Sequence, residues 1–396
     1  MGIRPPLRQR EAKMPGKKGE HRSVPPDRSQ DGLPGRHVAT FFLSVTDRCN
    51  LACNYCSAAA GPHNGAMLDP ARAEDLVRQW IPGAIASRLT LVFTGGEPLL
   101  WGYDNLGRIC HAAREEASAG RKDLAIGIQS NGLLVDEDFI GFCRKYEIEP
   151  SFSLDGPPPI NDIHRGGGQR VVASLKMLKA RQIDFAIVSC LTHQLAARIE
   201  PVLEWFRKQG FLKVRINSLG QPPPERAAIS QSDPRSLFYV KKSIFDHMEE
   251  HGAAAVQERN VLRQVKKFDA LFGGLPAATE HCEQLQCGAG RNLVCLNPDG
   301  SLSPCVEKSM SDGPGCAHSP GELAGARESL LRKTGTWEIC RDCPADIICD
   351  HGCAAYHRMD HDAFAGECLA NRLFWKYLVL KRAPMLAVSE GADHES

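Results

Sequence analysis

Short apolar segments alternate with amphipathic segments from His37 to about residue 218, and this alternation restricts the fold more than any other feature of the chain. Several of the apolar segments have apolar residues at consecutive positions, which is typical of parallel strands covered on both faces. Helical segments lie between them, and Asp69 followed by Pro70 is a typical helix start. The pattern predicts an α/β fold, a partial (β/α)6 TIM-like barrel, because six βα units are too few to close an eight-stranded one. The expected strands are residues 38–45, 88–94, 123–129, 147–153, 184–191 and 212–218.

Each of the first four expected strands runs into a polar motif. The first enters a loop with the spacing C-x3-C-x2-C, formed by Cys49, Cys53 and Cys56. The next three enter the motifs TGGEP (94–98), QSNG (129–132) and SLDG (153–156). Because the C-terminal ends of parallel strands share one edge of a sheet, the four loops are expected to form one site.

The cysteine loop has the composition of an iron–sulfur site. Three thiolates can ligate three irons of a [4Fe–4S] cluster and leave the fourth iron open for a small molecule. The alternative is a structural zinc site, but zinc normally takes four protein ligands and His63 is the only histidine near the loop. We therefore predict an open iron–sulfur cluster.

The motif C-x3-C-x2-C with Tyr55 inside it, followed by GGEP after the second strand, resembles the radical S-adenosylmethionine (SAM) superfamily over about residues 37 to 225. The resemblance implies an enzyme in which SAM chelates the open iron through its amino and carboxylate groups. One electron from the cluster then cleaves SAM to methionine and a 5′-deoxyadenosyl radical, which abstracts a substrate hydrogen. A low-potential donor, flavodoxin or ferredoxin, would supply that electron.

The same resemblance implies a set of SAM contacts. Gly95 and Gly96 would let the backbone approach the ligand, and Glu97 would accept hydrogen bonds from the SAM ammonium. Ser153 would bond ribose or carboxylate, and Arg165 would clamp the carboxylate. The adenine would lie along the backbone of Tyr55 and under Leu219.

A second group of cysteines lies near the C-terminus, and its spacing resembles a SPASM domain, which holds two auxiliary [4Fe–4S] clusters. The family assigns one cluster to Cys282, Cys287, Cys305 and Cys353, and the other to Cys340, Cys343, Cys349 and Cys368. Cys316 is a rival to Cys282, and a zinc ribbon is the alternative for residues 340–353. Pro298-Asp299-Gly300 predicts a hairpin turn that returns Cys305 beside the strand of Cys295. The remaining thiols, Cys110, Cys143, Cys190 and Cys295, are predicted to be buried small apolar residues.

Composition sets the domain plan and limits the partners. The chain has 396 residues, which favours one large and one smaller domain, and 48 basic against 47 acidic residues, which indicates neither a nucleic-acid nor a membrane partner. With no signal peptide or membrane-spanning run, a cytoplasmic protein is expected. The expected parts are a flexible basic tail (1–36), the barrel (37–225), a helical bridge (226–281), the cluster domain (282–385) and a flexible end (386–396).

The whole arrangement resembles enzymes that modify ribosomally made precursor peptides, so the preferred hypothesis is a peptide maturase that makes an oxidative crosslink. In the related anaerobic sulfatase maturases, which form formylglycine, an aspartate follows the cysteine at the end of the hairpin and serves as the base. Here Val306 follows Cys305, which weighs against that second hypothesis. A small-molecule SPASM dehydrogenase is a third hypothesis. A non-catalytic iron–sulfur electron carrier is a fourth, but it would not need GGEP, Ser153 and Arg165 around the cysteine loop.

Overall fold

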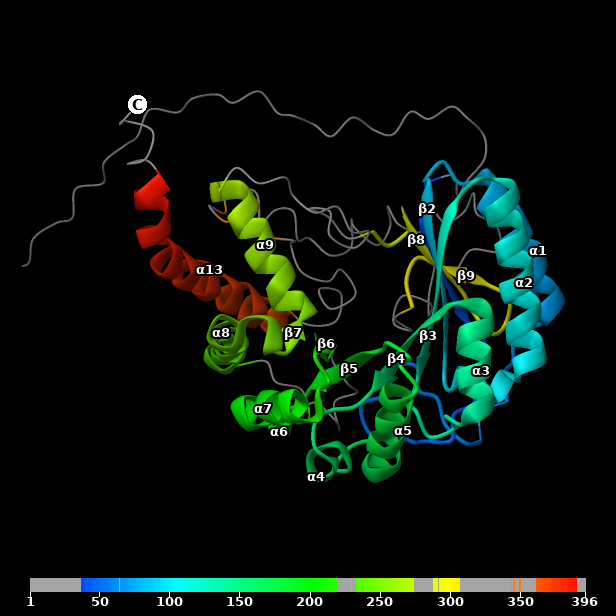
Figure 1. The fold of residues 1–396 in the computed structure, drawn as a ribbon, viewed down its shortest axis with the longest axis horizontal. Coiled ribbons are helices and arrows are strands. Elements are labelled where there is room, and N and C mark those ends of the chain that lie inside the picture. Colours follow the sequence, from blue (N-terminus) through cyan, green and yellow to red (C-terminus); the bar gives the residue numbers. More distant parts are fainter. Residues whose placement is uncertain are drawn as a thin grey trace, which may run out of the picture. The chain divides into compact units, whose positions relative to one another are not determined.

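A parallel β-sheet with helices on its outer side forms the centre of the computed structural model (Figure 1). The structure describes residues 37–63, 65–219, 229, 233–273, 288–290, 292–306, 343, 345, 349 and 361–389, with the side chains of 365–382 in the last range. The predicted tail 1–36 lies outside these residues. The barrel elements are β1 (Thr40–Ser44), α1 (Pro70–Gly83), β2 (Arg88–Thr94), η1 (Pro98–Trp101), α2 (Tyr103–Ala119), β3 (Asp123–Ser130), α3 (Glu137–Tyr146), β4 (Ile148–Ser153), α4 (Pro158–Asn161), α5 (Gly168–Ala180), β5 (Ala186–Leu191), α6 (His193–Ala196), α7 (Ile199–Gln209) and β6 (Lys213–Ser218).

The sheet follows the chain from β1 to β6. All five pairs from β1–β2 to β5–β6 are parallel, and their registers place Ser44 beside Thr94 and Ser153 beside Val188. The strand positions predicted from the sequence are confirmed, with ends that differ by no more than two residues. The C-terminal ends of the strands therefore meet at one edge, as the motif positions predict.

The two faces of each strand differ in burial, which fixes the direction of the side chains. In β2, Leu89, Leu91 and Phe93 are fully buried and belong to the hydrophobic core beneath the helices. Of the alternate residues, Thr90, Val92 and Thr94 are half-buried and Arg88 is exposed, and all lie on the opposite face. Burial of each large core side chain contributes about 1.5–3 kcal/mol, so this alternation holds the register of the sheet. Asp69 caps α1 by accepting from the backbone N–H of Ala71 at 3.1 Å, as predicted.

Two further strands extend the sheet beyond β1. The strand β8 (Leu293–Leu296) pairs parallel with β1, and β9 (Leu302–Ser303) pairs antiparallel with β8. The predicted hairpin is confirmed, because Cys295 lies opposite Ser303 and Gly300 turns the chain at φ +81°. Attachment of this hairpin to the barrel sheet was not predicted. The described start of the expected cluster domain thus shares a sheet with the barrel.

The predicted bridge supplies the other end of the sheet. Here β7 (Gln257–Glu258) pairs with β6, and it lies between α8 (Pro234–His251), with the short η3 (Gly252–Ala254), and α9 (Arg259–Gly273). The last helix, α13 (His361–Ser389), lies beside α8 and α9 and packs Phe374 and Trp375 against Phe245 and Phe268 (Figure 1).

The bounds of the C-terminal helix α13 differ from those predicted. It begins before Cys368 rather than after it, and it continues to Ser389, so the first four residues of the expected flexible end are helical. Among the described residues, no helix is long and apolar enough to cross a bilayer.

Candidate functional site

The cysteine loop follows β1 and lies against the loops after the neighbouring strands. Backbone hydrogen bonds fix its path: Cys49 N–H donates to the carbonyl of Gly61 at 3.1 Å, and Asn54 N–H donates to the carbonyl of His164 at 3.0 Å. Cys49 is buried, whereas Cys53 and Cys56 are half-buried. The structure thus brings the three predicted ligands together at the C-terminal edge of the sheet.

Gly95 and Gly96 bring the loop after β2 into close contact with the cysteine loop. Gly96 N–H donates to the carbonyl of Thr46 at 2.6 Å, and Gly95 has φ +121°. A Cβ atom on Gly96 would lie 2.3 Å from the carbonyl oxygen of Arg48, closer than any side chain could approach. The close approach that requires glycine is therefore an approach to the chain's own cysteine loop, a reason that differs from the predicted contact with a ligand.

Glu97 is a buried carboxylate that joins β2 to β3. Its oxygens accept from Ser130 Oγ at 2.9 Å, Leu99 N at 3.1 Å and Asn131 N at 2.8 Å. Burial raises the pKa of Glu97 to about 7, although these three hydrogen bonds oppose the shift. A carboxylate has about four acceptor positions, so one remains for a further donor such as an ammonium.

Two donors approach the sulfur atoms of the cysteine loop. Asn131 Nδ2 lies 3.7 Å from Cys49 Sγ, and Arg165 Nη1 lies 4.0 Å from Cys53 Sγ. The motif QSNG, which contains Asn131, was expected at the site, but no role was predicted for Asn131 itself. Its position directly after β3 is the signal that could have identified it.

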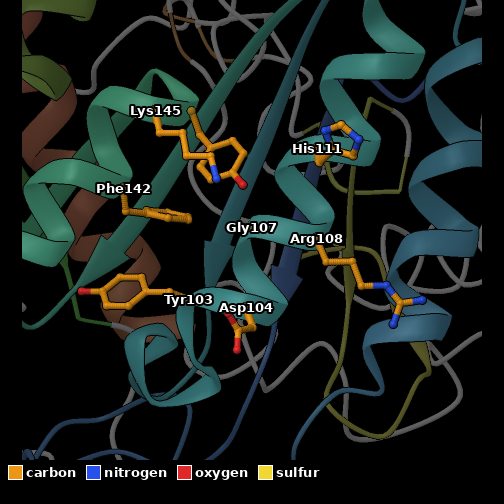
Figure 2. Close-up of a pocket in the computed structure, with 8 residues that line it drawn as sticks. Tyr103, Asp104, Gly107, Arg108, His111, Phe142 and Lys145 are labelled. Atoms are coloured by element: carbon orange, nitrogen blue, oxygen red, sulfur yellow. The ribbon is translucent and has the colours of Figure 1, made fainter.

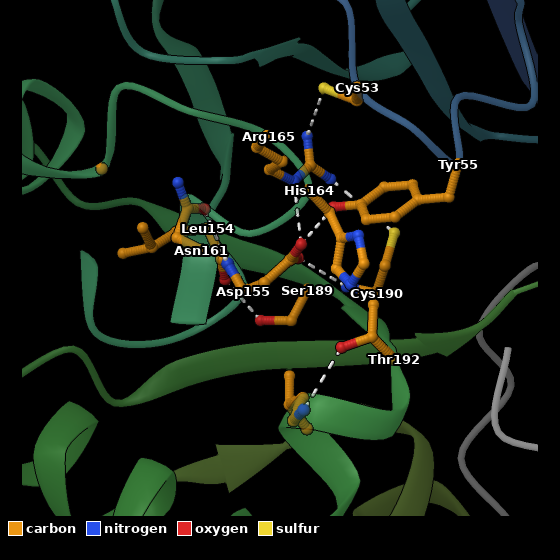
Figure 3. Close-up of polar contacts among 12 residues, drawn as sticks. Cys53, Tyr55, Leu154, Asp155, Asn161, His164, Arg165, Ser189, Cys190 and Thr192 are labelled. Carbon is orange, nitrogen blue, oxygen red and sulfur yellow. Dashed lines mark hydrogen bonds and ion pairs between the residues drawn. The ribbon is translucent and has the colours of Figure 1, made fainter. Parts of the chain in front are cut away.

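A second unpredicted feature is the group of buried polar residues beside Tyr55 (Figure 3). Asp155 is 1% exposed and binds the hydroxyl of Tyr55 and the guanidinium of Arg165. Cys190 was predicted to be a buried apolar residue. This prediction is wrong, because Cys190 is half-buried and its thiol contacts the charged side chain of Arg165. Its neighbours Ser189 and Leu191 are buried, so Cys190 faces the inside of the barrel, where its Sγ lies 3.7 Å from Arg165 Nη2. The alternation of β5 would have revealed this direction.

The other predicted contacts lie along the same edge of the sheet. Ser153 is buried at the end of β4, and Leu219 is half-buried directly after β6. Cys110, Cys143 and Cys295 are buried as predicted.

Burial also acts on the thiols of the loop. It raises the pKa of Cys53 to about 11, an effect that the positive charge of Arg165 partly opposes, and it raises the pKa of Cys49. Metal ligation requires thiolates, so binding of iron would release these protons. Within the described part of the chain, no group of three or more Cys, His, Asp or Glu side chains is arranged to hold a single metal ion. A four-iron cluster instead takes its thiolates on separate irons.

Comparison with known proteins identifies this region. Residues 43–206 match the model of the radical SAM superfamily. They form a radical SAM domain. The protein is therefore an enzyme, and its cofactors are SAM and [4Fe–4S] clusters. The donor set of the site fits such a cluster, because cluster ligands are thiolates and N–H groups beside their sulfurs stabilise them.

The similarity to curated relatives extends beyond the radical SAM domain. A cysteine-type anaerobic sulfatase-maturating enzyme of Clostridium perfringens is 25% identical over 287 residues, covering 68% of this chain and 74% of the relative. A serine-type anaerobic sulfatase-maturating enzyme of Klebsiella aerogenes is 27% identical over 333 residues, which cover 78% of this chain and 77% of the relative.

Solved structures share the fold at lower identity. The structure of native anSMEcpe with bound AdoMet has a TM-score of 0.70 at 18% identity and covers 88% of this chain and 98% of its own. The structure of Streptococcus suis SuiB bound to the precursor peptide SuiA has a TM-score of 0.60 at 15% identity. The match covers 82% of this chain and 76% of SuiB.

The described C-terminal cysteines lie outside the radical SAM domain. Cys305 follows β9, Cys368 lies on α13, and Cys343 and Cys349 are described singly; all four are half-buried. Cys343 lies close enough to Cys368 to raise the pKa of that thiol, although burial is the larger cause. The other predicted ligands, Cys282, Cys287, Cys340 and Cys353, and the rival Cys316 lie outside the described residues.

A pocket between α2 and α3 is remote from this chemistry (Figure 2). Tyr103, Phe142 and Tyr146 line it together with Arg108 and Lys145. Arg108 forms an ion pair with Glu74, with 2.5 Å between its Nε and Oε2 of Glu74. The pocket lies on the helical side of the sheet and contains none of the predicted site residues.

Proposed function

We propose that the protein is a maturase that modifies a ribosomally made peptide or protein by radical chemistry, with an oxidative side-chain crosslink as its reaction. One observation carries this proposal: three cysteines share a loop at the C-terminal edge of the barrel, with N–H donors beside two of their sulfur atoms. The relatives named for sulfatase maturation and the SuiB structure with its precursor peptide support a polypeptide substrate.

Cys49, Cys53 and Cys56 would hold the SAM-binding cluster. The SAM contacts remain those predicted: the backbones of Tyr55, Gly95 and Gly96, and the side chains of Glu97, Ser153, Arg165 and Leu219. Arg165 suits a carboxylate because its guanidinium is already fixed on one side by Asp155 at 3.2 Å. Glu97 keeps one acceptor position for the ammonium.

Two auxiliary clusters would be bound by the C-terminal cysteines. The proximity of Cys343 and Cys368 supports their assignment to one cluster, with Cys340 and Cys349 as its other ligands. Cys282, Cys287, Cys305 and Cys353 are the proposed ligands of the other cluster. The half-buried Cys305 is presented by the hairpin at the β1 side of the sheet.

When bound, these cofactors supply a 5′-deoxyadenosyl radical for hydrogen abstraction and accept the electron that the substrate gives up. The chain's own residues then have three tasks. The loops after β1 to β4 orient SAM, the buried Glu97 and Asp155 fix those loops to one another, and the barrel walls exclude water from the radical.

Anaerobic reconstitution tests the proposal. We expect about twelve irons per chain for three clusters, and 5′-deoxyadenosine formed from SAM under a low-potential reductant. Peptides encoded beside the gene should stimulate turnover and lose the mass of two hydrogen atoms. About four irons would reject the auxiliary clusters. Full iron content without turnover on any peptide would reject the peptide substrate.

Formylglycine formation on a sulfatase is the second candidate. The similarity to sulfatase-maturating enzymes over two thirds or more of the chain favours it. The residue after Cys305 weighs against formylglycine formation. It is Val306, whose side chain is 38% exposed and has no group that can act as a base. A sulfatase peptide with Cys or Ser at the target position would separate the candidates: an aldehyde product supports the second, and an unchanged peptide excludes it.

A further inference from the structure

The carboxylate of Asp155 connects its own segment after β4, which also carries Arg165, with the cysteine loop and with β5 (Figure 3). Its Oδ2 accepts from the hydroxyl of Tyr55 in the cysteine loop and from Arg165 Nε at 3.2 Å. Its Oδ1 accepts from the backbone N–H of Cys190 in β5 at 2.8 Å. Asp155 itself follows β4, and its own N–H donates to Asn161 Oδ1 at 3.2 Å. Both carboxylate oxygens are therefore committed to protein donors.

Arg165 is held in one orientation by these contacts. Each of its three guanidinium nitrogens has a separate partner: Nε has Asp155, Nη1 has Cys53 Sγ at 4.0 Å, and Nη2 has Cys190 Sγ at 3.7 Å. The ring of Tyr55 lies 5.2 Å from the guanidinium carbon, and the side chain is only 11% exposed. Three of its five N–H groups are thus used by the protein, and two remain for a ligand.

From this geometry we infer that Asp155 is a positioning residue for the SAM-binding cluster, acting through Arg165. The inference rests on the proposed function, since it takes Cys53 as a cluster ligand. The carboxylate holds the guanidinium so that one N–H group faces the sulfur of Cys53 and the two remaining N–H groups face the SAM site. Hydrogen bonds and positive charge beside the sulfur atoms of a cluster raise its reduction potential. By orienting Arg165, Asp155 therefore affects both the affinity of the site for SAM and the reduction potential of the cluster.

A purely structural role makes a different prediction. A buried ion pair is weak evidence for stability, because the cost of removing both charges from water offsets much of their attraction. The structure offers a matched control in Ser189, whose Oγ donates to the carbonyl of Leu154 at 2.6 Å. Ser189 is as buried as Asp155 and also links the β4 end to β5, but that hydrogen bond does not involve Arg165.

The experiment uses the full chain with reconstituted clusters and no peptide. We would compare Asp155→Asn and Ser189→Ala with the wild type in iron content, SAM affinity, the electron paramagnetic resonance spectrum of the reduced cluster and its midpoint potential. Asp155→Asn should keep its iron, bind SAM about tenfold or more weakly, show a changed spectrum on SAM addition and have a midpoint potential that differs from the wild type. Ser189→Ala should match the wild type in all four.

Wild-type SAM affinity and potential in Asp155→Asn would overturn the inference, and so would equal changes in Ser189→Ala. If Asp155→Asn does not fold, Tyr55→Phe replaces it: this variant removes one donor to Asp155 and keeps the ion pair. It should weaken SAM binding in the same direction by a smaller factor, and no change would again overturn the inference. These readouts need no substrate, so failure to modify any peptide would reject the proposed function and leave this result standing.

Discussion

The two groups of cysteines differ in what positions them. Cys49, Cys53 and Cys56 lie in one loop, which the barrel shapes through Gly96, Asn131 and Arg165. The described C-terminal cysteines come from separate segments: Cys305 follows a hairpin and Cys368 lies on a helix. Barrel contacts thus fix the loop of the first site, whereas the second draws its cysteines from separate segments. The two sites should therefore respond differently to loss of a ligand or of metal.

Loss of one ligand from each site should have the largest and most different effects. Cys53→Ala should abolish 5′-deoxyadenosine formation and lower the iron content from about twelve to about eight per chain, because one of three four-iron clusters is lost. Cys368→Ala should retain SAM cleavage but form no modified peptide. Iron analysis and chromatography of the nucleoside measure both. SAM cleavage retained by Cys53→Ala would contradict the assignment of the first site.

Disruption of the contact between the loops after β1 and β2 should have the second largest effect. In Gly96→Ala the new methyl group would meet the backbone of Arg48 at 2.3 Å, so the cysteine loop must move. We expect stability to fall by about 2–4 kcal/mol, with loss of the first cluster and retention of auxiliary iron. Denaturant unfolding and iron analysis measure these changes.

Gly141→Ala is the control for that substitution. Gly141 lies within α3, and a methyl group added there would meet no described atom within 4 Å outside its own stretch of helix. Alanine should therefore stabilise the helix by about 0.5–1 kcal/mol. Equal destabilisation by the two variants would show that the loop contact has no special importance.

The buried carboxylate of Glu97 should make the stability of the iron-free barrel depend on pH. Burial raises its pKa from 4.5 to about 7, so the folded state binds the proton more tightly than the unfolded state. This contribution is fully present below pH 4.5 and is lost as the pH rises through 7, a change of about 3 kcal/mol. Glu97→Gln should remove this part of the pH dependence in urea unfolding, whereas the exposed Glu149→Gln should keep it. Parallel curves for Glu97→Gln and the wild type would contradict the prediction.

The sequence predicted the six barrel strands and the cysteine loop because both depend on local patterns. Strand alternation and the spacing of the first three cysteines are each readable within a few residues. The roles of Asp155 and Cys190 were missed because they depend on contacts with Tyr55 and Arg165 across the sheet, 100 residues apart for Tyr55 and Asp155. Pairing of β8 with β1 was missed for the same reason, since it joins segments about 250 residues apart. The ligand sets of the auxiliary clusters remain predictions.

The smallest effect should come from the turn that presents Cys305. Asp299 Oδ1 accepts from Ser301 N at 2.9 Å and from Ser301 Oγ at 2.6 Å, which fixes the hairpin between β8 and β9. Asp299→Ala should cost about 1 kcal/mol and lower auxiliary iron without affecting 5′-deoxyadenosine formation. Asp123→Ala, which removes only the exposed ion pair with Arg88, should change neither stability nor iron. If Asp299→Ala keeps all its iron, the auxiliary site does not depend on the turn, and the difference between the two groups of cysteines would be smaller than the fold suggests.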